Sequence, residues 1–290
     1  MIKVCNYISA FVISLAFLSC NDEINLPKTL LIQSQADLDL YCEQLLETTN
    51  YNGSIVIRDE TENLDLSCFK NIRSVSSSLI LEGTNAAKAL RHIESAGREG
   101  LALGGTIEET IVFDKLFSTN SINIFSNSTI EGLHFPSVEI LDKFSMGSFV
   151  KINALTGLNK VISMTVVNMP NAGNQIGEID VFEKLRTTKF LNMTLPSETK
   201  ISSSSFDGLL GVFIEANFSK KELHTSFQEL FPKLKTCERF KITSEDVELK
   251  DLCYLKSSLE SNDIKIILKS SFQSSTVEVY NNLDILNACQ

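Results

Sequence analysis

The sequence lacks the short motifs of the common catalytic sites. It contains no G-x-S-x-G, H-E-x-x-H, G-x-x-x-x-G-K or C-x-x-C, and so carries no signature of a serine hydrolase, zinc protease, P-loop protein or thiol oxidoreductase. Its three histidines, His92, His134 and His224, are at least 42 residues apart, which rules out a local pair of metal ligands. We therefore expect a protein that is not an enzyme, with no cofactor and no metal.

Proline and glycine are also scarce. The chain has 5 prolines and 13 glycines in 290 residues, and no stretch rich in either marks a domain boundary. We expect residues 31–290 to form a single domain, which is long enough to bury a substantial core.

Basic residues are outnumbered by acidic ones. The chain has 26 Lys and Arg against 36 Asp and Glu, for a net charge of −10. Nucleic acid is therefore a poor partner, because its binding depends on neutralising phosphates. Anionic membrane surfaces are disfavoured for the same reason, which leaves room only for a local basic patch.

The N-terminus has the layout of a signal peptide. Lys3 is followed by an apolar run, ISAFVISLAFL (8–18), and then by Ser19 and Cys20. This run is about half of the roughly 20 residues that a membrane-spanning helix needs. The sequence Phe17-Leu18-Ser19-Cys20 resembles a lipobox, in which the cysteine is acylated and becomes the mature N-terminus. We expect residues 1–19 to be removed, with an ordinary secretory leader as the alternative.

The segment after Cys20 predicts a location. Asn21-Asp22-Glu23 resembles the acidic stretch that directs some Bacteroides-type lipoproteins to the outer face of the outer membrane. Residues 20–30 would then be the acylated cysteine, carrying palmitate or a similar chain, and a tether. We expect a surface-exposed lipoprotein whose contact with the membrane is its lipid anchor, since two or more acyl chains hold a protein stably.

Apart from Cys5 and Cys20 near the N-terminus, the chain has five cysteines, so at least one of these five has no partner among them. In an oxidising compartment, Cys42 would pair with Cys68, and Cys253 with either Cys237 or Cys289. The alternative is that they are buried, reduced thiols.

One phrase recurs along the chain: an apolar-x-x-apolar step, a short polar spacer, and a brief strand. The copies begin at 69, 90, 113, 155, 182 and 227, and include FKNIRSVSSSLIL and FDKLFSTNSINIF. The strands are centred on Ile55, Leu79, Leu101, Ile122, Met164, Leu191, Val212, Phe240 and Ile266.

These centres are mostly 21 to 28 residues apart, which fits one turn of a solenoid. The gap of 42 residues between Ile122 and Met164 predicts two turns, with a less regular one near residues 149–152. The pattern predicts a β-rich solenoid of parallel strands, with the apolar steps filling its core.

The segment before the first strand predicts a capping helix over 34–46, with Ser34 as its N-cap and Asp37 three residues later. Such a helix would cover the open end of the core.

The run from Ile32 to Gly83, with QSQADLDLY, NYNGSIVI and LDLSCFKNIRSVSSSLILEG, resembles the start of a receptor L-domain-like protein of the Bacteroides type. The segment LPSETKISSSSFDGLLGVFIEANF (195–218) is similar to the degenerate leucine-rich repeats of bacterial surface proteins. The resemblance implies a right-handed, leucine-rich solenoid that binds a partner. It implies no site residue, because the shared positions belong to the core.

Strand alternation predicts which side chains leave the core. We expect the side chains of six pairs of residues to point into the core: 55 and 57, 79 and 81, 122 and 124, 164 and 166, 191 and 193, and 212 and 214. The outward neighbours form the predicted binding face: Val56, Arg58, Ile80, Glu82, Asn123, Phe125, Thr165, Val167, Asn192, Thr194, Phe213 and Glu215. Exposed apolar residues often mark interfaces.

The sequence predicts a lipid-anchored recognition protein for a protein or glycan partner. A structural lipoprotein of an outer-membrane assembly is the alternative. A β-helix carbohydrate-active enzyme is a third, for which Asp59, Glu60 and Glu82 would be the stacked carboxylates.

Overall fold

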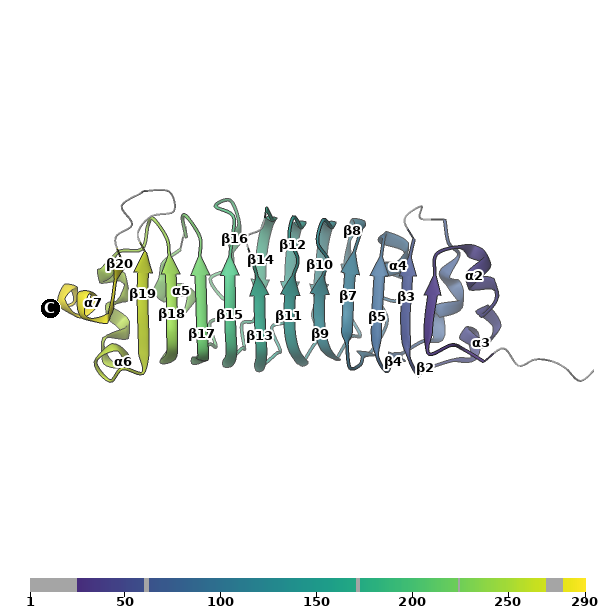
Figure 1. The fold of residues 1–290 in the computed structure, drawn as a ribbon, viewed down its shortest axis with the longest axis horizontal. Coiled ribbons are helices and arrows are strands. Elements are labelled where there is room, and N and C mark those ends of the chain that lie inside the picture. The colour runs from purple at the N-terminus through teal and green to yellow at the C-terminus, as the bar shows by residue number, and fades with distance from the viewer. Residues whose placement is uncertain (1–24, 60–62, 171–172, 224, 270–278) are drawn as a thin grey trace, which may run out of the picture.

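The computed structural model describes residues 25–59, 63–170, 173–223, 225–269 and 279–290. The predicted leader, Cys20 and the whole acidic stretch, Asn21 to Glu23, lie outside these residues. The chain winds in successive coils that stack along one axis, and the result is an elongated array of parallel strands (Figure 1). No helix among the described residues is both long and apolar enough to cross a membrane.

The larger sheet, sheet A, has 15 strands and runs the length of the molecule. Its main path joins neighbouring coils in parallel, and only its last pair is antiparallel. The strands on this path are β1 (Thr29–Ile32), β3 (Ser54–Arg58), β5 (Ser78–Glu82), β7 (Gly100–Gly104), β9 (Ser118–Ile124), β11 (Ile140–Met146), β13 (Ser163–Met169), β15 (Thr187–Thr194), β17 (Gly211–Ser219), β18 (Thr236–Thr243), β19 (Ile264–Lys269) and β20 (Val279–Tyr280). Three short strands, β2 (Asn50–Tyr51), β4 (Ser74–Val75) and β6 (Ser95–Ala96), extend it beside β9.

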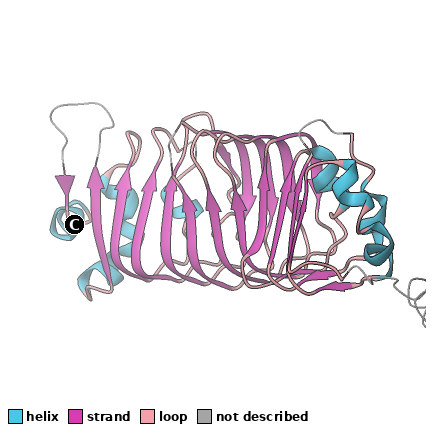
Figure 2. Ribbon diagram, turned by 45° about the vertical axis from the view of Figure 1, so that its right-hand side comes forward, coloured by secondary structure: helices cyan, strands magenta, loops and turns pink. Residues whose placement is uncertain are grey.

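The smaller sheet, sheet B, lies behind sheet A in the middle coils (Figure 2). Its five parallel strands are β8 (Thr106–Val112), β10 (Thr129–Phe135), β12 (Lys151–Gly157), β14 (Gln175–Val181) and β16 (Lys200–Ile201). The fold predicted from the sequence has one strand per coil, so this second sheet is an addition to it.

Helices occupy the back of the molecule at both ends. Near the N-terminus these are α2 (Gln35–Asp39), α3 (Cys42–Glu47), the 3-10 helix η1 (Leu66–Asn71) and α4 (Thr84–Ala89). Near the C-terminus they are α5 (Phe227–Leu230), the 3-10 helix η2 (Leu249–Leu255), α6 (Lys256–Glu260) and α7 (Asn282–Ala288).

The predicted first helix is divided into α2 and α3. Ser34 is the N-cap of α2, and Asp37 completes a capping box with it, as predicted. Leu38 and Leu45 bury the inner face of the pair. The first strand already begins at Thr29, before the predicted domain start at residue 31.

Apolar-x-x-apolar steps lie in the core and form the corner between the back of a coil and sheet A. The steps predicted at 69, 90 and 182 are such corners, whereas two others begin at Leu158 and Phe231, three and four residues after the predicted starts at 155 and 227. In six coils the second apolar residue donates its backbone N–H to the carbonyl of the first; examples are Ile72 to Phe69 at 3.0 Å and Leu185 to Phe182 at 3.0 Å. Successive corner rings are in contact, and the Phe182 and Phe206 centroids are 5.8 Å apart. This stack fills the core along the axis.

The middle of sheet A departs from strict alternation. In β13 both Met164 and Val167 are buried, while Thr165 and Val166 between them face outward. An extra residue of this kind bends the strand, as a β-bulge does. The prediction that Val166 points inward and Val167 outward is therefore wrong. Ile214 in β17 was also predicted inward and is 42% exposed, for the same reason.

The coil between Ile122 and Met164 is regular. Phe144 of β11 pairs with Ile122 on one side and Val167 on the other, so it is the missing strand centre. The predicted irregular coil at 149–152 is instead the turn that enters β12, where Phe149 is exposed with φ of 57°.

Candidate functional site

The predicted binding face extends along sheet A from β3 to β17 and is not one patch. Val56, Ile80, Asn123 and Asn192 belong to a single outward row, in which each residue is paired in register with its equivalent in the next coil. This row is apolar near the N-terminus and becomes a ladder of amides and hydroxyls from Asn123 onward. The Asn192 Nδ2 donates to Asn168 Oδ1 at 2.8 Å, and the Ser145 hydroxyl donates to Asn123 Oδ1.

The other predicted residues differ in what they present. Arg58 and Glu82 form an ion pair at 3.0 Å across two coils, so neither charge is free for a ligand. Phe125 is 36% exposed and its ring lies over Gly104, where a Cβ would come within 2.7 Å of it. Phe213 is 59% exposed and Glu215 is half-buried.

Two further members of the predicted face are threonines, and a third predicted member, Val167, does not belong to the face. Thr165 and Thr194 are half-buried on the outer side, and the Thr165 hydroxyl donates to Asp142 Oδ1. Val167 is fully buried, so it cannot contact a partner.

A hollow with a volume of about 590 Å³ lies on the outer face of sheet B. We call it the sheet B groove. Two outward rows of polar side chains line it. The first row is Thr106, Thr129, Lys151 and Gln175. The second consists of the residues two positions later, Glu108, Glu131, Asn153 and Gly177.

Between these rows runs a third, of buried isoleucines that includes Ile107, Ile130 and Ile176. They fix the register, since a slip by one residue would expose every one of them. The Asn153 Nδ2 donates to Glu131 Oε2 at 2.7 Å, which orients one carboxylate of the groove. Gly177 supplies no side chain, and Glu198 of the next coil also reaches the lining.

This groove was not predicted, although a signal for it is present in the sequence. The triplets Thr-Ile-Glu (106–108), Thr-Ile-Glu (129–131), Lys-Ile-Asn (151–153) and Gln-Ile-Gly (175–177) recur at the solenoid period with an apolar residue between two polar ones. That is the pattern of a half-buried strand. The predicted fold has one strand per coil, so these triplets were not assigned to a second sheet.

A smaller hollow of about 380 Å³ lies between η1 and α4 near the N-terminus. Its lining includes Lys70, Lys88 and His92. Burial, and secondly Arg73, lower the pKa of His92, so its imidazole is neutral near pH 7. Lys88 forms an ion pair with Glu109 at 3.0 Å.

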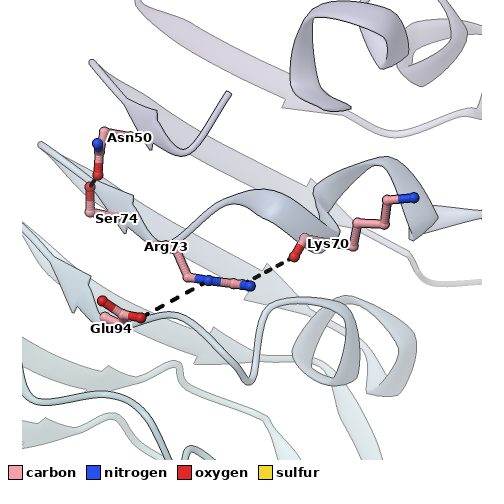
Figure 3. A network of polar contacts seen from close by, with 5 residues as sticks. All are labelled: Asn50, Lys70, Arg73, Ser74 and Glu94. Carbon is pink, nitrogen blue, oxygen red and sulfur yellow. Dashed lines mark hydrogen bonds and ion pairs between the residues drawn. The ribbon is translucent and has the colours of Figure 1, made fainter. Parts of the chain in front are cut away.

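The polar contacts beside this hollow join neighbouring coils. Figure 3 shows Arg73 reaching Glu94 on one side and the Lys70 carbonyl on the other, while the Lys70 ammonium group points away. Asn50 and Ser74 hold equivalent positions in β2 and β4, and their side chains are hydrogen-bonded at 2.6 Å. This network is structural.

The structure distinguishes between the two predicted partners of Cys253. Cys253 is disulfide-bonded to Cys289, with the Cα atoms 5.5 Å apart, so Cys237 is not its partner. Cys237 is a buried free thiol. Cys42 and Cys68 are also free thiols, although their side chains are hydrogen-bonded to each other, so the predicted disulfide between them is not formed here.

The carboxylates considered for catalysis differ in their surroundings. Glu82 is paired with Arg58, Asp59 is buried, and Glu60 lies outside the described residues. Within the described part of the chain, no three His, Cys, Asp or Glu side chains are grouped as a metal site would require. Of the histidines, His134 bonds Thr156 at 2.8 Å in sheet B, and His224 is not described.

Comparisons with family models, curated proteins and solved structures gave no significant match. The resemblance to receptor L-domain-like and leucine-rich-repeat proteins therefore stays a prediction.

Proposed function

We propose that this chain is a lipid-anchored recognition protein of the bacterial cell envelope, and that it binds an extended glycan in the sheet B groove. The observation that supports this most is the pair of polar rows, which repeat from coil to coil along the groove.

The spacing of these rows suits a carbohydrate polymer. Neighbouring strands lie about 4.8 Å apart, so equivalent side chains recur at that interval along the axis. Sugar rings of a linear glycan follow one another at a similar distance, whereas an extended peptide advances about 3.3 Å per residue. Threonine hydroxyls, amides and carboxylates match sugar hydroxyls, which both donate and accept hydrogen bonds.

The charge of the lining narrows the class of glycan. Three carboxylates, from Glu108, Glu131 and Glu198, face one ammonium group, from Lys151. An acidic glycan would be repelled. The ligand is therefore a neutral glycan or one with amino sugars.

The anchor and the finer fold class belong to the same proposal. The lipid is attached to Cys20, and β1 begins nine positions later at Thr29, which keeps the N-terminal end of the array near the membrane. The coils are right-handed, as parallel crossovers almost always are, and α2 and α3 cap the core. Loss of palmitate labelling in Cys20→Ala tests the anchor.

The binding test uses an array of neutral and amino-sugar oligosaccharides and the purified full chain. Glu131→Gln combined with Asn153→Ala removes a hydrogen-bonded pair from the groove. We expect at least about tenfold weaker binding, since a hydrogen bond to a charged group contributes roughly 1.5 to 3 kcal/mol. Glu139→Gln is the matched control, because Glu139 lies outside the groove next to Lys160.

Equal loss of binding in Glu139→Gln and the groove variant would contradict the groove as the site. The same incubations, analysed for shortened oligosaccharides, test the proposal that the protein does not catalyse. Products that disappear in Glu131→Gln would instead support the carbohydrate-active enzyme.

A further inference from the structure

The C-terminal half of sheet A carries a charge opposite to that of the whole chain. From β11 to β19 its strands contain six basic residues and three acidic ones, and none of the nine is buried. The basic residues are Lys143, Lys189, Arg239, Lys241, Lys265 and Lys269. The acidic residues are Asp142, Glu215 and Glu238. We call this surface the basic face.

The charges on the basic face are mostly available to a ligand. Among the described residues, the one ion pair within it joins Arg239 Nη1 to Glu215 Oε1 at 3.9 Å. Interactions between exposed charges are largely screened beyond about 8 Å at physiological ionic strength. The local excess of positive charge therefore decides what binds there, although the chain has a net charge of −10.

Apolar and amide groups lie among these charges. Phe190 is 39% exposed and Phe213 is 59% exposed, on adjacent strands of sheet A. The amides of Asn168, Asn192 and Asn217 follow one another in register beside them. Exposed aromatic rings next to hydrogen-bonding groups are typical of a binding surface.

A hollow of about 280 Å³ opens on this face next to Ile214. Its walls include Arg239 and Lys265, which stand on the neighbouring strands β18 and β19, and the carboxylates of Glu215 and Glu238. The hollow itself is balanced in charge, and the excess of positive charge comes from the lysines around it. Because Arg239 is 3.9 Å from Glu215, outside hydrogen-bond range, its guanidinium and the Lys265 ammonium keep N–H donors for a carboxylate or sulfate group.

We propose that the basic face binds an acidic polysaccharide, with Arg239 and Lys265 contacting its anionic groups and Phe190 and Phe213 contacting its ring faces. This site lies on the opposite sheet from the groove and takes a ligand of the opposite charge, so it goes beyond the function proposed above. Charge complementarity selects a polyanion. The strand spacing of about 4.8 Å favours a polymer of sugar rings over an extended acidic peptide.

The experiment titrates the purified full chain with polygalacturonate. Fully methyl-esterified polygalacturonate is the neutral comparator, because it has the same backbone without the charges. We expect binding to the acid polymer alone, weakening as salt rises from 50 to 300 mM. Arg239→Ala with Lys265→Ala should weaken it at least about tenfold, as expected for charge-assisted hydrogen bonds. Phe190→Ala should weaken it by a smaller factor.

Three further measurements decide the outcome. Arg239→Lys with Lys265→Arg retains both charges and should restore most of the binding, which excludes a folding defect. The groove variant Glu131→Gln with Asn153→Ala should bind polygalacturonate as the unaltered chain does, so the two proposals fail independently. Equal binding of the methyl ester, tighter binding of poly-glutamate, or no binding of polygalacturonate would overturn the proposal.

Discussion

The outer faces of the two sheets differ in extent, relief and charge. Sheet A runs the whole length of the molecule, and its C-terminal half presents aromatic rings and basic side chains. Sheet B occupies only the middle coils, and its face is hollowed, polar and acidic. Both faces share one core, so the same inward residues support two surfaces that are suited to ligands of opposite charge.

The difference comes from the outward residues alone. On sheet B the buried isoleucine row is flanked by hydroxyl, amide and carboxylate side chains, and Gly177 adds no side chain to them. On sheet A the bend in each middle strand places two outward residues between inward ones, such as Thr165 and Val166 between Met164 and Val167. The bend widens the outer face and makes room for exposed rings. Repetition of a core therefore does not imply repetition of function.

The largest effect on stability is expected from placing a charge on the inner side of the bend in β13. Val167→Asp buries a carboxylate in the core and should lower the free energy of unfolding by about 4 kcal/mol or more. Val166→Asp, on the adjacent outward position, should change it by about 1 kcal/mol or less. Urea denaturation measures both. Similar losses in the two variants would show that the strand alternates strictly.

An intermediate effect is expected from the glycine of the groove. A Cβ at Gly177 would lie 2.4 Å from the Asn153 carbonyl oxygen. Gly177→Ala must therefore push neighbouring strands of sheet B apart, at a cost of roughly 1 to 3 kcal/mol. Gln175→Ala, two positions earlier and exposed, is the control and should be nearly neutral. An unchanged melting temperature in Gly177→Ala would mean that the strands are farther apart than described.

A smaller effect on stability is expected at the two exposed rings of sheet A, Phe125 and Phe213, which should differ in their effect on binding. Phe125→Ser and Phe213→Ser should each lower stability by about 1 kcal/mol or less, because both rings are partly in solvent. Only Phe213→Ser should reduce binding of polygalacturonate, since Phe125 lies in the N-terminal half, over Gly104. Unfolding of either variant would place that ring in the core.

The smallest effect concerns a thiol on the inner side of sheet A. Burial raises the pKa of Cys237 to about 11, so at pH 8 it is protonated and shielded. Alkylation with iodoacetamide at pH 8, followed by peptide mass spectrometry, should leave Cys237 unlabelled in the folded chain and label it in urea. Labelling of the folded protein would contradict the register that pairs Cys237 with Val212.

Much of the fold could be predicted from the repeat. The apolar steps, the period, the parallel strands and the Ser34 N-cap are confirmed, because each depends on local spacing or chemistry. The missing strand centre at Phe144 could not be found from the repeated phrase, because no copy of the phrase begins between residues 113 and 155. Strict alternation predicts Val166 inward and Val167 outward, and the bend in β13 reverses these two orientations.

The sequence by itself determined the acidic balance, the N-terminal Lys-apolar-Cys pattern and the solenoid period, because these are properties of composition and spacing. Tertiary structure alone decided which surfaces exist. Stacking brings residues 23 positions apart, such as Thr106 and Thr129, side by side, and pairs Cys253 with Cys289 instead of Cys237. The physical reason is that a groove or a charged face is made by neighbours across coils, and their identity depends on register and bends that no single coil encodes.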